Sequence, residues 1–290
     1  MERRPIIFDW EFCLDPVCAI HISHSSIPLR YVFMSPSSPE SRRTVSPAES
    51  PRSRGNDSEW SGCNSCHLRD QGFCSILQQG RKSNPEVEPR ETSIRARQHI
   101  YRAKDQARHL AIIREGMTFR YVTATDGRRQ ILSVGMPGDF VATSFVVRDT
   151  AHFSVQALTP VRLCLFDKKA LQQFIRSDLA ALHCFLDLIV SEKESREAQI
   201  VDLGRRTSEE RIARFLLHMA TRSGWSGEGG FSFHFPIRQQ HIADMLGLTQ
   251  VHVSRVISKF RRSGFIQLGS SLLKIADPYA LRQAAGGRNV

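Results

Sequence analysis

The sequence lacks any apolar run near the roughly 18 residues that a membrane-spanning helix requires, so we expect no membrane segment. It also lacks a signal-peptide core, because Asp9, Glu11 and Asp15 interrupt the apolar residues that follow Arg3 and Arg4. We therefore expect the protein in the cytoplasm, where thiols stay reduced. The seven cysteines, an odd number, then predict metal ligands, nucleophiles or buried residues rather than a disulfide framework.

Acidic residues are fewer than basic ones, since 29 Asp and Glu stand against 40 Lys and Arg and leave a formal charge of +11. A basic surplus of this size favours a polyanionic partner, although by itself it would also suit an anionic membrane surface. The length of 290 residues suits two domains with tails.

Residues 1–60 are predicted to be a disordered tail, because they lack periodicity and residues 35–59 are rich in Ser, Pro, Arg and Glu. Met34 stands just before this polar tract, which leaves open whether residues 1–33 belong to the protein. Cys13 and Cys18 fall in the tail without a third ligand nearby, and we do not expect them to bind metal.

The segment of residues 61–91 carries a C-x2-C-x7-C cluster formed by Cys63, Cys66 and Cys74. A two-residue gap lets neighbouring thiolates reach one metal centre, and we expect the third cysteine to lie in the next turn of a loop. One ligand position is then left for a distant residue. The segment alone leaves three interpretations open: an iron–sulfur site, a zinc knuckle completed by His67, and three free thiols.

Residues 92–169 are predicted to form a β-rich domain, a sandwich or jelly-roll barrel, because short apolar segments recur between turn signals. The expected strands are residues 99–102, 110–114, 119–123, 130–134, 140–143, 153–158 and 162–166. Cys164 lies in the last of them and, taken alone, reads as a small buried residue. A barrel enzyme of the cupin type is not expected, because His99, His109 and His152 do not form a tight metal-binding set.

Residues 170–204 are predicted to form one long helix with a heptad seam, which is typical of helices that pair in a dimer. The simpler interpretation, a helix packed on its own barrel, applies to part of it. The predicted dimer interface consists of Leu182, Leu186, Ile189, Lys193, Arg196 and Ile200. In a parallel dimer Lys193 and Arg196 would each face their own copy, and we expect the like charges to weaken association. Cys184 lies off the seam and is expected to be a packing residue.

Residues 237–266 contain two helical patterns separated by Gly247, within a C-terminal domain of residues 205–283. Gly247 suits the left-handed position after a helix, and Thr249 suits the N-cap of the next one. Two short helices with a tight turn predict a helix-turn-helix, and the acid-free polar face of the second helix favours DNA binding over a buried hairpin. The expected DNA contacts are Gln250, Val251, His252, Ser254, Arg255 and Lys259. Residues 266–268 and 272–275 then suggest a two-stranded wing, and residues 284–290 a tail.

The order of these parts resembles the Crp/Fnr superfamily of bacterial transcription regulators. The resemblance covers residues 63–281 and is carried mainly by the segments TDGRRQILSVGMPGDFV and DMLGLTQVHVSRVISKFRRSGFI. It implies an α+β fold with an N-terminal cyclic-nucleotide-binding-like jelly-roll barrel, a long dimerisation helix and a C-terminal winged helix-turn-helix. It also implies a regulator rather than an enzyme.

Within this superfamily, three cysteines before the barrel and one in a late barrel strand mark the oxygen-sensing Fnr branch. Cys63, Cys66, Cys74 and Cys164 match those four ligands in order. The resemblance therefore implies an oxygen-labile [4Fe–4S] cluster that promotes homodimerisation and binding to palindromic double-stranded DNA when oxygen is absent. RNA polymerase is a further implied partner.

Two positions depart from the family pattern. Val251 stands where the Fnr-type recognition helix has Glu, so it can touch a thymine methyl but cannot accept a hydrogen bond from a base, while Arg255 can still pair with a guanine. Arg97 and Lys104 stand where the family has glycines in the first barrel turns, and we expect those turns to use other residues.

The remaining alternatives concern the effector. In the cAMP-binding branch an Arg-Ser pair holds the phosphate, but here the aligned stretch is Ala151-His152-Phe153 after a loop that begins Gly138-Asp139. A phosphate would meet no guanidinium in that stretch, and Arg148 is only nearby. Zinc or thiol-redox control through the same cysteines, or another small-molecule effector, remains the alternative to an iron–sulfur cluster.

Overall fold

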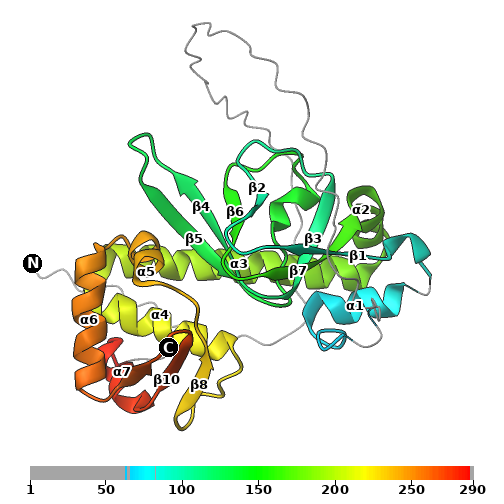
Figure 1. Ribbon diagram of the computed structural model, residues 1–290. Coiled ribbons are helices and arrows are strands. Elements are labelled where there is room, and N and C mark those ends of the chain that lie inside the picture. The colour runs from blue at the N-terminus through cyan, green and yellow to red at the C-terminus, as the bar shows by residue number, and fades with distance from the viewer. Residues whose placement is uncertain (1–62, 64–65, 82, 288–290) are drawn as a thin grey trace, which may run out of the picture. The chain divides into compact units, whose positions relative to one another are not determined.

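The computed structural model describes residue 63 and residues 66–81 and 83–287, so the predicted tail with Cys13, Cys18 and Met34 lies outside it. The described chain begins with a short cysteine-bearing segment and helix α1 (Gly72–Gly80), continues through a β-barrel and a long helix, and ends in a helical domain with a small sheet. Figure 1 shows this order of elements. The predicted α+β class is confirmed.

The barrel consists of two antiparallel sheets that face each other across an apolar core. One has the strand order β1-β7-β3, formed by Arg90–Ile94, Val161–Asp167 and His109–Glu115. The other has the order β2-β6-β4-β5, formed by His99–Tyr101, Ser154–Ala157, Thr118–Thr123 and Arg129–Gly135. Strand β3 is apolar on both faces and buried along most of its length, because helices and loops cover the side that does not face the opposite sheet.

One predicted strand is absent from the barrel, and one unpredicted strand is present. The prediction of a strand over residues 140–143 is wrong, because Phe140 makes only an isolated bridge to Ile112 and the chain then enters the short 3-10 helix η3 (Thr143–Val146). The backbone there follows the turn at Gly138 and pairs with β3 for too few residues to form a ladder. Strand β1 was not predicted, since its sequence RETSI is largely polar and its pairing to β7 is decided by tertiary contacts.

The first barrel turns keep the left-handed backbone that glycine favours, although they contain Arg97 and Lys104. Their φ angles are +68° and +74°, and they are the non-glycine residues with positive φ in the described chain. These turns therefore use residues other than glycine, as expected, and keep the backbone conformation that glycine favours. Each turn is fixed by a backbone hydrogen bond of 2.8 Å, from Arg97 N–H to Ala157 O and from Lys104 N–H to Ala151 O.

The predicted single helix after the barrel is divided into α2 (Lys168–Ser177) and α3 (Leu179–Arg205). Asp178 lies between them in an extended conformation, and its carboxylate accepts a hydrogen bond of 2.9 Å from Ala181 N–H as the N-cap of α3. Residue 178 was thus read as part of a continuous helix, although aspartate is a strong N-cap residue. The break separates α2, which packs on β7, from α3, which runs along the barrel and contacts it through Glu192 and Arg196.

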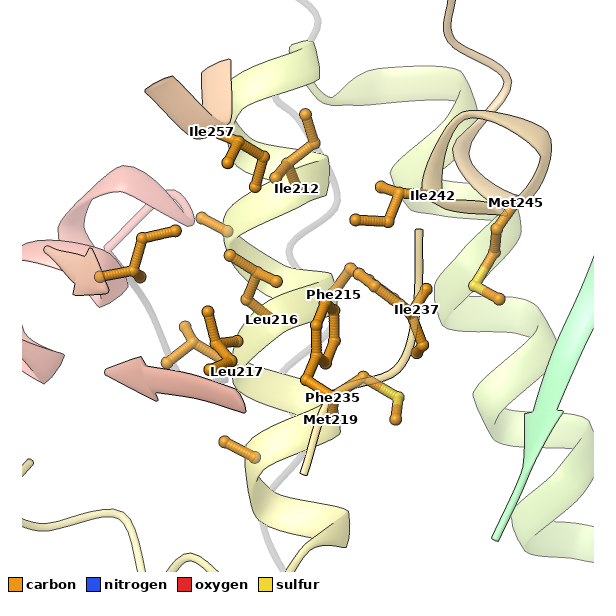
Figure 2. Packing of buried hydrophobic residues seen from close by; sticks show 14 of the residues in the cluster. Ile212, Phe215, Leu216, Leu217, Met219, Phe235, Ile237, Ile242, Met245 and Ile257 are labelled. Atoms are coloured by element: carbon orange, nitrogen blue, oxygen red, sulfur yellow. The ribbon is translucent and has the colours of Figure 1, made fainter. Parts of the chain in front are cut away.

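The C-terminal domain is built around α4 (Ser208–Arg222), which begins with a capping box between Thr207 and Glu210. Figure 2 shows Phe215, Leu216 and Met219 of α4 packed against residues of α5 (Gln239–Leu246) and of the segment that precedes it. The other elements are β8 (Phe231–His234), α6 (Gln250–Arg262), β9 (Ile266–Leu268), β10 (Leu272–Ile275) and the unpredicted α7 (Pro278–Ala284). The predicted wing is confirmed and gains β8 as a third strand, in the order β8-β10-β9.

None of the helices in the described residues is long and apolar enough to cross a membrane.

Candidate metal centre and nucleic-acid interface

The four predicted ligand cysteines come from three places in the fold. Cys63 and Cys66 lie in a turn, where Cys66 N–H donates a hydrogen bond of 3.2 Å to Cys63 O. Cys74 lies on α1 rather than in the expected loop. Cys164 lies on β7, the central strand of its sheet, where it pairs with Glu91 of β1 and Ile112 of β3.

The structure brings these four thiols together. Each of the six pairs among them is close enough that one cysteine raises the pKa of another. Burial is the larger cause and, with these neighbours, raises the pKa of Cys74 and of Cys164 to about 12. All four are free cysteines, and Cys164 is the most buried of them.

The surroundings of the thiols fit a group that carries negative charge. Arg81 and Arg114 both lower the pKa of Cys63, and Arg114 also lowers that of Cys164, so two guanidinium groups lie near the site. Arg114 is held in place by Glu91, with 2.7 Å between Nη1 and Oε2. Four thiolate donors suit soft metals and iron–sulfur clusters. In the part of the chain that the structure describes, no three His, Cys, Asp or Glu side chains are grouped for a single metal ion.

An aromatic contact connects the cysteine segment to the long helix. Phe73 precedes Cys74 and is buried, and its ring lies 6.3 Å from that of Phe185 on α3. Phe140, which follows the Gly138-Asp139 turn, completes the group with centroid distances of 5.2 Å to Phe73 and 6.0 Å to Phe185. A change in the position of α1 would therefore change the packing of Phe73 on Phe185 of α3.

The exposed apolar face of α3 differs from the predicted seam by a rotation of the helix. Leu186 and Ile200 are exposed as expected, with 50% and 68% of their surface accessible, and Val190 and Val201 join them. Leu182 instead packs partly against the barrel core, and Ile189 lies at the edge of the face at 37%. Arg196 turns away from the exposed face, because its guanidinium donates a hydrogen bond to Leu132 O on the barrel. Lys193 remains on the exposed face and pairs with Glu197 at 2.6 Å.

The helix-turn-helix has the predicted local geometry. Gly247 ends α5 with a left-handed backbone of φ +62°, and the Thr249 hydroxyl accepts a hydrogen bond of 3.2 Å from His252 N–H at the start of α6. Helix α6 buries Val253, Val256, Ile257 and Phe260. Of the predicted DNA contacts, Ser254 is half-buried and the others are exposed: Gln250, Val251, His252, Arg255 and Lys259. Val251 therefore stands outside the apolar stripe, with 61% of its surface accessible.

Two of these residues have partners on α4 that the sequence did not reveal. The imidazole Nε2 of His252 lies 2.8 Å from Ser208 Oγ, and Lys259 Nζ lies 2.7 Å from a carboxylate oxygen of Glu209. The acidic opening of α4 was visible in the sequence, but only the packing of α4 against α6 places it beside Lys259. A DNA phosphate at Lys259 would have to compete with Glu209.

A second contact that the sequence did not reveal joins the barrel to α5. Arg129 on β5 donates two hydrogen bonds, of 2.9 and 2.5 Å, to Asp244 on α5. The same guanidinium lies over the Phe119 ring at 4.9 Å, and Gln130 donates to Met245 O at 3.0 Å. No sequence pattern pairs residues that lie so far apart in the chain.

A cleft of about 710 Å³ lies between the barrel, α3 and α4, and it bears on the cyclic-nucleotide alternative. Its lining includes guanidinium groups that lie outside the stretch aligned with the phosphate-binding Arg-Ser pair of the cAMP-binding branch. Among them are those of Arg120, Arg196 and Arg222. Two are already paired with carboxylates, Arg120 with Glu192 at 3.1 Å and Arg222 with Asp139 at 2.5 Å. A phosphate would have to displace these partners, so the cleft is poorly prepared for an anionic ligand.

Two family models match the chain, and they correspond to its two folded parts. A cyclic nucleotide-binding domain model matches residues 91–178, and a Crp-like helix-turn-helix domain model matches residues 210–284. These boundaries agree with the barrel with α2, and with the C-terminal domain.

Similar proteins cover most of the chain. A nitrogen fixation regulation protein FixK of Bradyrhizobium diazoefficiens is 30% identical over 216 residues, which are 74% of this chain and 90% of that protein. A transcriptional activator protein FnrL of Cereibacter sphaeroides is 28% identical over 229 residues, 77% of this chain and 92% of that protein. Among solved structures, FixK2 from Bradyrhizobium japonicum matches with a TM-score of 0.62 and 25% identity, over 68% of this chain and 98% of that one.

Proposed function

Because the chain belongs to the Crp/Fnr family of DNA-binding transcription regulators, we propose that it senses oxygen through a [4Fe–4S] cluster and binds its promoter sites when oxygen is low. The proposed ligands are Cys63, Cys66, Cys74 and Cys164. Similarity to the activator FnrL supports the Fnr branch, while similarity to FixK proteins leaves the effector to be decided by this chain's own residues.

The observation that supports the proposal is that four cysteines from a turn, a helix and a strand lie near enough to influence one another electrostatically. When bound, a [4Fe–4S] cluster supplies oxygen sensitivity, because its sulfide-bridged irons are readily oxidised. Arg81 and Arg114 each already pair with a carboxylate, Glu88 and Glu91, so they would offset the negative charge of the thiolates only in part. The buried position of Cys164 would keep water from that ligand.

The alternatives with the same cysteines have less support. A thiol-redox sensor needs exposed thiols with a low pKa, whereas burial raises the pKa of Cys74 and Cys164 to about 12. A zinc ion draws all its ligands to about 2.3 Å from one centre. In a four-iron cluster each thiolate ligates a different iron, and this wider arrangement suits thiols that are neighbours without forming a single-ion group in the described residues.

The path from the cysteines to DNA runs through α1 and α3. Ligation of Cys74 would hold α1 in place, and Phe73 would then press on Phe185 of α3. The exposed apolar face of α3 is the proposed homodimer interface, because dimerisation is typical of the family. A dimer presents two α6 helices to one face of palindromic double-stranded DNA, with Arg255 pairing with guanine and Val251 contacting a thymine methyl. RNA polymerase is a further expected partner.

The test is to replace each proposed ligand by serine and to measure bound iron and acid-labile sulfide after purification without oxygen. Each single replacement of the four cysteines should abolish the visible absorption of the cluster, because one missing thiolate leaves one iron without its protein ligand. The matched control is Cys184→Ser, since Cys184 is half-buried on α3, outside the cysteine segment and outside β7. It should retain parental iron and sulfide.

The contrary result is also well defined. Stoichiometric zinc without sulfide in the anaerobic parent protein would replace the iron–sulfur proposal by zinc control. Loss of iron in Cys184→Ser as well would show that the four cysteines are not the specific ligand set.

A further inference from the structure

A cleft of about 560 Å³ lies between the barrel and the winged helix-turn-helix. Its polar residues come from the β1–β2 turn, β6, the start of α5, the first residue of α6 and the turn of the wing: Arg97, Gln156, Arg238, Gln239, His241, Gln250, Ser270 and Ser271. The lining, as far as the structure describes it, includes no Asp or Glu. The cleft is thus cationic and rich in hydrogen-bond donors.

Both guanidinium groups are available to an outside anion. Arg97 and Arg238 are exposed, and the ion pairs of the described residues involve neither of them. This contrasts with the cleft beside α3, where Arg120 and Arg222 are already neutralised by carboxylates. A phosphate could therefore bind here without displacing a protein partner.

The backbone of Arg97 is fixed on both its polar groups. Its N–H donates to Ala157 O at 2.8 Å, and its carbonyl accepts from Gln156 Nε2 at 2.7 Å. The residue has a φ of +68°, at which glycine would be favoured. Strained backbone conformations of this kind cluster at functional sites, so the Arg97 side chain is a candidate for binding.

We propose that this cleft receives the sugar–phosphate backbone of DNA beside the half-site, and that Arg97 is a phosphate contact contributed by the barrel. Gln250 lines the cleft and also begins the exposed face of α6. When the N-terminal residues of a recognition helix enter the major groove, the strand that borders the groove passes beside them. Its phosphates are the anions that the cleft would meet. The inference rests on DNA binding by the helix-turn-helix and is independent of the proposed cluster.

Such a contact adds affinity without base specificity, since phosphates carry no sequence information. It also makes the sensor domain part of the DNA-binding surface. Any displacement of the barrel from α5 and α6 would then change the affinity for DNA directly, in addition to any effect on the dimer.

The experiment compares Arg97→Gly with Lys104→Gly in the full-length protein purified without oxygen. Both replacements remove one positive charge from a barrel turn and restore the residue that a positive φ favours, but only Arg97 lines the cleft. The DNA is a duplex with long flanks, selected from a random pool by the parent protein, and a copy trimmed to the recognised bases. Arg97→Lys serves as a third variant that keeps the charge.

On the long duplex, Arg97→Gly should bind several-fold more weakly than the parent, and the slope of log K against log salt should fall by about 0.9 per protomer, the value for one lost phosphate contact. Lys104→Gly should match the parent, and Arg97→Lys should recover the slope. On the trimmed duplex all four proteins should bind alike.

Parental affinity and salt slope in Arg97→Gly would overturn the proposal. Equal losses in the two glycine variants would also overturn it, because they would reflect net charge alone. If inorganic phosphate raises the melting temperature of the parent but not of Arg97→Gly while their DNA affinities stay equal, the cleft binds a small anion instead, which again overturns the proposal.

Discussion

Gly80 ends α1 at a place where no larger side chain fits. A Cβ atom at this position would overlap the ring of Phe174 on α2, a residue that is 1% exposed and belongs to the barrel core. The close approach holds α1, and with it Cys74, against the rest of the sensor domain. A small change at Gly80 should therefore be felt at the proposed cluster.

We expect Gly80→Ala to destabilise the protein by about 1–3 kcal/mol, the cost of overpacking a core. The sign of the change in unfolding free energy distinguishes packing from helix propensity, because propensity alone would stabilise the variant by up to about 1 kcal/mol. Urea unfolding measures the free energy, and iron content after anaerobic purification should fall as α1 is displaced. Gln79→Ala, at the exposed neighbouring position, should change neither quantity. A more stable Gly80→Ala protein would mean that α1 does not pack as described.

Local geometry explains which residues could be predicted from the sequence. Gly247 and Thr249 were placed correctly, because a left-handed C-terminal residue and a side-chain N-cap depend only on neighbouring backbone groups. Arg196 was misplaced, since its rotation toward Leu132 depends on where the barrel lies. The four cysteines were selected by a family resemblance, and no spacing rule could have joined Cys164 to the others.

At the scale of elements, periodic segments were predictable and short or polar ones were not. Helices α5 and α6 have clear apolar stripes and were expected on either side of Gly247. Helix α1 was expected as a loop, because its stripe contains just two buried residues, Phe73 and Leu77, and its fold depends on packing against α3. Long-range contacts between elements, such as that of β5 with α5, leave no periodic trace.

The ion pair of Arg129 with Asp244 should contribute measurably to the free energy of the contact between the barrel and α5. Both side chains are largely buried, at 27% and 13% exposed, so solvent screens the pair less than a surface ion pair. A double-mutant cycle of Arg129→Ala and Asp244→Ala, read by urea unfolding, should give a coupling free energy of about 1–3 kcal/mol.

Arg128→Ala is the matched control for that cycle. The neighbouring Arg128 also pairs with an aspartate, Asp126, but its side chain is 87% exposed. Its removal should cost no more than about 0.5 kcal/mol. A coupling free energy near zero for Arg129 with Asp244 would show that the barrel and α5 separate freely in solution.

At the scale of the whole molecule, α3 is the element whose exposed surface calls for a partner. Of the large apolar residues that are exposed in the described chain, a majority lie on this helix: Leu179, Leu186, Ile189, Val190, Ile200, Val201 and Leu203. Contiguous exposed apolar surface marks an interaction site. The pair of Lys193 with Glu197 interrupts it midway, and two like pairs facing each other in a parallel dimer would retain water and weaken association.

Replacing Lys193 by isoleucine should therefore let the protein dimerise in air without a cluster. The change joins Val190 to Ile200 in one apolar face. Each fully buried isoleucine contributes about 1.5–3 kcal/mol and a dimer buries two, so association should gain about 10²–10⁴-fold. Sedimentation of the aerobic protein measures the monomer–dimer equilibrium. Arg205→Ile removes the same charge and adds the same side chain at the last residue of α3, where it does not join Val190 to Ile200, so it should dimerise less than Lys193→Ile. If Lys193→Ile sediments like the parent, this face of α3 is not the dimer interface, and the route from α1 to DNA must pass through the barrel and α5 instead.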